Sequence, residues 1–150
     1  MKITTKLAAA TVAAAGVVSI GAPTASADDA AATTHKIGDQ AKVADGAVVQ
    51  GWTVSDLRTS TDAIPYQVRG TLWEATATDE ALEGAVIPIV SNLNARAEDG
   101  QTYRALFQVA SLEGINPATL APGQQTTGKV YFDVTGESPD SVVYNAGGRD

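Results

Sequence analysis

Hydrophobic and polar side chains alternate along several short stretches of the chain. In residues 48–54, VVQGWTV, the apolar side chains of Val48, Trp52 and Val54 fall on one side of an extended backbone. A period of two is typical of a β-strand that buries one face. The sequence therefore predicts a strand here.

The same period recurs in residues 102–110, TYRALFQVA. Arg104 and Gln108 fall on one side of the extended chain, and four less polar side chains share the other: Tyr103, Ala105, Phe107 and Val109. We expect a second strand that runs to residue 110 with these four side chains in the core.

Residues 123–136, GQQTTGKVYFDVTG, contain a third alternating run. One face holds Val130, Phe132 and Val134. The other face holds Lys129, Tyr131 and Asp133. We expect the polar face to meet solvent, so that Asp133 needs no catalytic role to explain its presence.

Three further runs indicate strands. Residues 67–78 alternate less clearly, and their inward face is left open; residues 86–94 contain Pro88, which lacks an N–H donor and favours an edge or a bulge. Residues 141–144, SVVY, predict a short last strand.

Segments rich in Gly, Pro, Asp, Asn and Ser separate these runs, as is usual for turns. They are Asp45-Gly46, 58–66, 79–84, 98–101, 111–125 and 135–141. Only residues 79–84, DEALEG, have helical leanings, over little more than one turn. The pattern predicts an all-β fold, an antiparallel β-sandwich of six to eight strands with Greek-key connections and no disulfide.

The first residues have the features of a cleaved export signal. Two lysines precede an apolar stretch, residues 7–20, and Ala25-Ser26-Ala27 supplies a small-x-small cleavage pattern. The stretch is shorter than the roughly 20 residues that a membrane-spanning helix needs. We therefore expect a signal peptide at 1–27, a flexible leader at 28–34, and one domain at 35–150 of a secreted, extracellular protein.

Charge and cysteine content limit the classes of partner and site that the chain can have. The chain has a formal net charge of −7, with ten basic and seventeen acidic residues; removing the signal, which holds two lysines and no acid, leaves −9. Such a surface repels phosphate backbones and anionic lipids, so we expect no nucleic-acid or membrane partner. The chain has no cysteine, which excludes disulfides and thiolate metal sites.

Candidate chemistry is sparse. His35 is the only histidine and lies beside the expected leader, a poor platform for a catalytic triad. Neither 79–84 nor 97–103 has the ligand spacing of a calcium loop. Trp52 and Trp73 suit the core better than a sugar-stacking platform. We expect no catalytic residue, cofactor or metal.

The order of several short motifs gives a resemblance. The segments GWTVSDL (51–57), LWEATAT (72–78), NARAEDG (94–100) and TTGKVYFDVTG (126–136) resemble the mycobacterial secreted immunogenic protein family of the MPT sixty-three type. The likeness covers nearly all of the processed chain. It implies an immunoglobulin-like sandwich, release outside the cell, immunogenicity and no established enzymatic activity.

The resemblance has one departure, at the end of the chain. Family members continue past Arg149-Asp150 into an apolar closing strand with a tryptophan. We expect either an uncovered edge here, open to a partner strand, or an edge protected by the segment near Ile37 to Val43.

The residues and the resemblance lead to one functional expectation. We expect a non-enzymatic binding module, monomeric or weakly dimeric, that meets a host or envelope protein through an edge strand or through loops 58–66 and 111–125. Two alternatives stay open: a hydrolase of envelope polymers that uses loop carboxylates, and a carrier of calcium or a small ligand.

Overall fold

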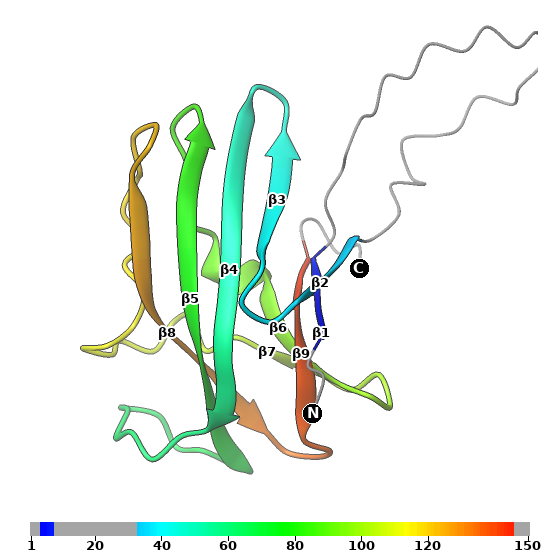
Figure 1. The fold of residues 1–150 in the computed structure, drawn as a ribbon. Helices are drawn as coiled ribbons and strands as arrows, with labels where there is room; N and C mark the ends of the chain where they lie inside the picture. The colour runs from blue at the N-terminus through cyan, green and yellow to red at the C-terminus, as the bar shows by residue number, and fades with distance from the viewer. Residues whose placement is uncertain (1–3, 8–32, 146–150) are drawn as a thin grey trace, which may run out of the picture.

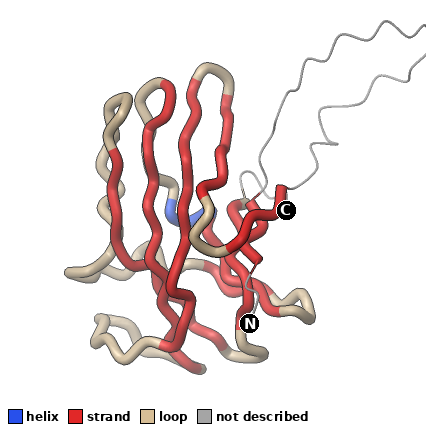
Figure 2. The backbone as a smooth tube through the Cα atoms, viewed as in Figure 1, coloured by secondary structure: helices blue, strands red, loops and turns tan. Residues whose placement is uncertain are grey.

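The computed structural model describes residues 4–7 and 33–145 (Figure 1). These residues form nine strands and one 3-10 helix, Val90–Asn92, so strands dominate the backbone (Figure 2). The strands are β1 Thr4–Leu7, β2 Thr33–Lys36, β3 Gln40–Asp45, β4 Val48–Thr59, β5 Thr71–Glu83, β6 Leu93–Ala97, β7 Thr102–Arg104, β8 Gln125–Val134 and β9 Pro139–Tyr144. Within the described ranges, no helix is long and apolar enough to cross a membrane.

Two sheets pack face to face. One has the strand order β3-β4-β5-β8 and the other β2-β1-β9-β6-β7 (Figure 1). All pairings are antiparallel except that of β1 with β9. After β2 the chain changes sheet four times: between β2 and β3, between β5 and β6, between β7 and β8, and between β8 and β9. The expected all-β sandwich is confirmed, and eight of the nine strands lie after residue 27.

The core lies between the sheets. Trp52 on β4 is fully buried, and its ring lies 5.8 Å from that of Tyr144 on β9. The inner face of β8 contributes the buried trio Val130, Phe132 and Val134. The predicted inward faces of 48–54 and 123–136 are therefore confirmed, and Trp52 is a core anchor rather than a sugar platform.

One carboxyl group lies inside this core. Asp79 pairs with Trp52 in the register of β4 and β5, is fully buried, and accepts no hydrogen bond at either carboxylate oxygen. Burial raises the pKa of Asp79 to about 7, because desolvation penalises the charged form. Nearby, Gln50 donates a 3.1 Å hydrogen bond to the Tyr144 hydroxyl.

Strand β5 differs from the prediction at both of its ends. The expected strand 67–78 is instead Thr71–Glu83, and 79–84 is not a helical turn, because Asp79 and Ala81 continue the inward alternation of Ala75 and Ala77. Gly70 marks the true start: a Cβ there would overlap the carbonyl of Val134.

Two predicted strands are correct over only a few residues, because the chain crosses between the sheets there. Residues 86–94 form only a bridge from Val86 to Leu120 and the 3-10 helix, and β6 begins at Leu93. Residues 102–110 leave the sheet after Arg104, since the Leu106 amide donates to the Tyr131 carbonyl on β8. Phe107, expected in the core, is 47% exposed.

The edge beside β9 is not protected by the segment near Ile37 to Val43, as one expectation had it. Most of that segment lies in β3, which pairs with β4 in the other sheet. In the full chain β1 lies beside β9, within the predicted signal peptide. Residues 28–32 of the predicted leader lie outside the described residues, and 33–34 begin β2.

Candidate functional site

Strand β8 presents Lys129 and Tyr131 on the outer face of its sheet, opposite the core. This face was expected to be wet, yet Tyr131 is only 4% exposed. The prediction is wrong here because two loops cover the strand. The Asp62 carboxylate accepts a 2.8 Å hydrogen bond from the Tyr131 hydroxyl, and Ser111 donates to the same hydroxyl at 3.4 Å.

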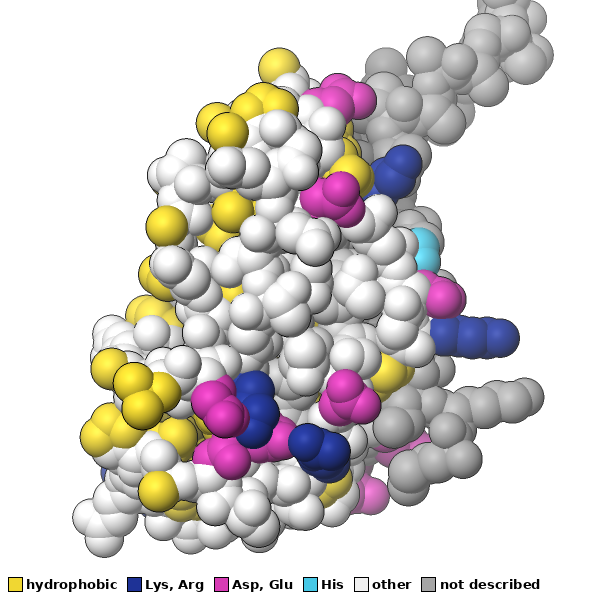
Figure 3. Space-filling model, turned by 60° about the vertical axis from the view of Figure 1, so that its left-hand side comes forward, with side chains coloured by type: hydrophobic (Ala, Val, Ile, Leu, Met, Phe, Trp, Pro, Cys, Tyr) yellow, Lys and Arg dark blue, Asp and Glu magenta, His cyan; other side chains and the backbone are white. Residues whose placement is uncertain are grey.

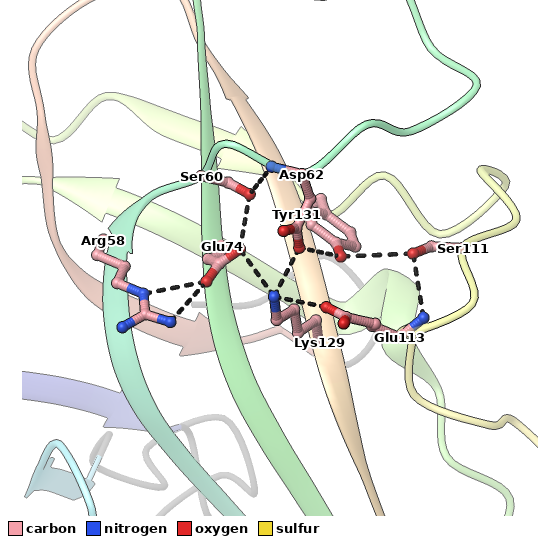
Figure 4. A network of polar contacts seen from close by, with 8 residues as sticks. All are labelled: Arg58, Ser60, Asp62, Glu74, Ser111, Glu113, Lys129 and Tyr131. Carbon is pink, nitrogen blue, oxygen red and sulfur yellow. Dashed lines mark hydrogen bonds and ion pairs between the residues drawn. The ribbon is translucent and has the colours of Figure 1, made fainter.

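Lys129 is the centre of a polar network that joins these loops (Figure 4). Its Nζ lies 2.6 Å from Oδ2 of Asp62, 2.6 Å from Oε2 of Glu113 and 3.3 Å from Oε2 of Glu74. Asp62 belongs to loop 58–66 and Glu113 to loop 111–125, so one cation fastens both loops to the sheet.

Glu74 on β5 forms the floor of the network. It is 5% exposed, and its carboxylate accepts hydrogen bonds from Arg58 Nε at 3.0 Å and from the Ser60 hydroxyl at 2.6 Å. Lys129 supplies a second positive charge. These contacts satisfy the buried Glu74 carboxylate and tie loop 58–66 to β5.

The pKa shifts in the network are those expected of a structural ion pair. Hydrogen bonds from Lys129 and Tyr131 lower the pKa of Asp62 to about 2. Asp62 and Glu113 raise the pKa of Lys129 above its usual range. All three carboxylates contact the Lys129 ammonium.

Replacing Lys129 with methionine should raise the pKa of Asp62 from about 2 toward its ordinary value of 3.8, while the hydrogen bond from Tyr131 still lowers it. Methionine keeps an apolar stem of similar length but removes the charge that holds the Asp62 carboxylate ionised. Carbon-detected NMR titration of the Asp62 carboxyl group measures this shift. Lys42→Met, at an exposed position of β3, should leave the pKa of Asp62 unchanged. An Asp62 pKa that stays near 2 in Lys129→Met would contradict the assignment.

An apolar groove opens beside the network. It encloses about 860 Å³ and lies between residues 87–91, residues 106–117 and the outer face of β8. Four large apolar side chains in its lining are exposed: Ile87, Ile89, Phe107 and Leu112. In Figure 3, apolar side chains gather beside a group of acidic and basic ones on this part of the surface.

Backbone hydrogen bonds hold the groove open. Val86 and Leu120 exchange two of them, at 2.9 and 2.7 Å, and tie its two walls together at one end. The Ile115 amide donates to the Lys129 carbonyl at 3.1 Å, which fixes the second wall on β8. Both walls are thus preformed, and a ligand would not have to order them.

The remaining residues singled out in the sequence have structural roles or lie elsewhere. Asp133 accepts 2.9 Å hydrogen bonds from the backbone amides of Arg69 and Gly70, so it shapes a turn. His35 lies on β2, and Trp73 packs against the core. Across residues 4–7 and 33–145, no group of His, Cys, Asp and Glu side chains is arranged to hold a metal ion.

Sequence reasoning selected loops 58–66 and 111–125 but missed the groove, which residues 87–91 and 106–117 line. Phe107 lies in an alternating run, where the pattern assigns it to the core, and Leu112 lies in loop 111–125, where nothing in the pattern pairs it with Phe107. Only the departure of the chain from β7 places them on the surface. No local signal in the sequence marks that departure.

Comparisons with known proteins extend over almost the whole chain. The profile of a family described as a domain of unknown function, DUF1942, matches residues 32–150. Immunogenic protein MPT63 of Mycobacterium tuberculosis and immunogenic protein MPB63 of Mycobacterium bovis are each 50% identical over 155 residues, across 100% of this chain and 96% of the relative.

A solved structure shows the same architecture. The 1.5 Å crystal structure of MPT63, a secreted protein from Mycobacterium tuberculosis, superposes with a TM-score of 0.73 at 51% identity. The match covers 76% of this chain and 89% of that one.

Proposed function

The chain belongs to the DUF1942 family and, with MPT63 and MPB63, to the secreted immunogenic proteins of mycobacteria, and from this membership we propose that it is a non-enzymatic binding module. Its contact surface is the groove, together with the Asp62 and Glu113 loops that Lys129 fastens beside it. The β-sandwich serves as the rigid scaffold for these segments.

One observation carries the proposal. Tyr66 aside, every exposed large apolar side chain in the described residues lines this one groove. Apolar side chains scattered singly over a surface need no explanation, but a contiguous exposed set marks an interaction site. The surface of a secreted protein without such a role has no reason to concentrate them.

The polar network supports binding over hydrolysis. A retaining or inverting glycosidase needs one carboxyl with a raised pKa next to a second carboxylate. In the network the shift of Asp62 runs the other way. Among the carboxyl groups that the structure describes, those with a raised pKa are Asp79, which is buried in the core, and Glu137, which other acids surround on the surface.

Site-specific crosslinking tests the contact surface. A photoreactive amino acid in place of the exposed, groove-lining Gln108 should give a discrete adduct in the secreting culture. The adduct should weaken when Leu112→Asn is added, because Leu112 is fully exposed and its loss alters the surface without disturbing the core. The same photoreactive group at Lys42, on the far edge of the four-stranded sheet, is the matched control.

Two results would overturn the proposal. Identical adducts from positions 108 and 42, or no adduct from position 108, would remove the groove as the contact surface. Hydrolysis of an envelope polymer by the wild-type chain that Glu113→Gln abolishes would show an enzyme instead.

A further inference from the structure

The charges around the groove select among possible partners. The lining contains one charged side chain, Lys129, and its ammonium is already paired with three carboxylates. In the network as a whole, those three face two cations, Lys129 and Arg58. The excess is negative, and it lies at the groove end where the Glu113 side chain is 60% exposed.

The negative excess disfavours two occupants. The whole chain carries a net charge of −7, so two copies that met groove to groove would bring like charges together. Anionic lipid headgroups would meet the same repulsion. A partner that carries positive charge next to apolar side chains would gain from both parts of the surface.

The shape of the surface favours a polypeptide over a small molecule. Small-ligand sites are concave and bury most of the ligand. Here Leu112 is fully exposed and Ile87 is 60% exposed, so the apolar side chains form ridges along an open groove. Ridges of this kind are covered by an amphipathic segment that lays one apolar face along them.

We propose that the groove binds a cationic amphipathic peptide segment, with apolar side chains against Phe107 and Leu112 and a lysine or arginine beside Glu113. This proposal rests on the proposed function, since it names the partner class for the same surface. The segment belongs to another protein and is recognised by its apolar face and its positive charge together. We expect neither the apolar face nor the positive charge alone to be enough for binding, because the surface has contacts for each of them.

Titration with designed peptides tests the proposal. A short peptide of alternating leucine and lysine should bind the full chain, and its binding should weaken with added salt. A matched peptide with glutamate in place of lysine should not bind, nor should one with serine in place of leucine. Vesicles that contain phosphatidylglycerol should not bind either.

Variants locate the binding on the protein. Leu112→Asn should lower the affinity for the leucine-lysine peptide about tenfold. Leu112 is fully exposed in the free protein, and the variant lacks the apolar side chain that the peptide would bury. Glu113→Gln should weaken it about threefold, as expected for a partly exposed ion pair, and should reduce the salt dependence. Asp45→Asn, an exposed acid at the distant β3–β4 turn, should have no effect.

The outcomes separate this inference from the proposed function. Equal binding of the glutamate peptide, no binding of the lysine peptide, or binding that Leu112→Asn and Glu113→Gln leave unchanged would overturn the inference. So would vesicle binding that Leu112→Asn removes. In each of these cases a groove-dependent crosslink from position 108 would still support the proposed function. The groove would then bind a partner of different chemistry.

Discussion

Asp79→Asn is expected to stabilise the protein by roughly 4 kcal/mol at pH 8 and to change its stability little at pH 4. Asp79 is fully buried, and neither carboxylate oxygen accepts a hydrogen bond. Folding therefore raises its pKa from 3.8 to about 7. Asparagine has nearly the same shape but carries no charge, so it avoids the cost of burying a charge at every pH.

The sign of the effect follows from proton binding. Between about pH 4 and pH 7, Asp79 is mostly protonated in the folded state and mostly ionised in the unfolded state. The contribution of Asp79 to stability is therefore fully present below pH 4 and is lost as pH rises through 7. Asp79→Asn does not lose this stability. The difference in free energy of unfolding between the variant and the wild-type chain therefore grows as pH rises from about 4 to 7.

Urea denaturation at several pH values measures the difference. Glu83→Gln removes an exposed charge from the end of the same strand and should show no such widening. A constant difference between Asp79→Asn and the wild-type chain from pH 4 to pH 8 would mean that Asp79 titrates as an ordinary surface acid. A destabilised variant at pH 8 would mean that an unseen partner satisfies the carboxylate.

The sequence could predict the strands that keep one partner along their whole length. The inward faces of 48–54 and 123–136 were identified correctly, because β4 and the edge strand β8 each keep one side against the core over these residues. It could not predict the end of β5. An inward carboxylate at Asp79 breaks the rule that buried positions are apolar, so the alternation was taken to stop one residue before it.

Segments that change sheets defeat pattern reasoning for a different reason. Alternation in 102–110 identifies two faces of the chain. It does not say which sheet the chain joins, or which of the two faces is exposed to solvent. The Ala105 amide still donates to the Leu93 carbonyl on β6, but from Leu106 the chain bonds to β8, and Phe107 and Val109 become part of the wall of the groove. Likewise, Asp62 and Lys129 are 67 residues apart, and only the packed sandwich brings them together.

Gly128→Ala is expected to destabilise the protein by about 2–3 kcal/mol, although alanine normally suits a strand better than glycine. A Cβ at Gly128 would overlap the backbone nitrogen and Cα of Ile115, where the loop crosses β8. Backbone cannot move aside as a flexible side chain can. Two hydrogen bonds would be strained, from the Ile115 amide to the Lys129 carbonyl and from the Lys129 amide to the Glu113 carbonyl.

Gly51→Ala is the matched control for this substitution. Gly51 also lies within a strand of the same sheet, but a Cβ there would meet only the Gln40 side chain, with the amide nitrogen 2.6 Å away. That side chain is exposed and can turn away, so the cost should stay below about 1 kcal/mol. Urea denaturation of both variants gives the comparison, and equal stabilities would contradict the close contact at Gly128.

The Gly128 substitution also tests whether the loop position creates the groove. Gly128 does not line the groove, so its variant keeps every lining side chain and every charge. Lifting the loop from β8 would nevertheless displace the wall that carries Leu112 and Ile115. We expect Gly128→Ala to lose the crosslink from position 108, while Gly51→Ala keeps it. A retained crosslink in a destabilised Gly128→Ala would mean that the exposed side chains bind without the preformed wall.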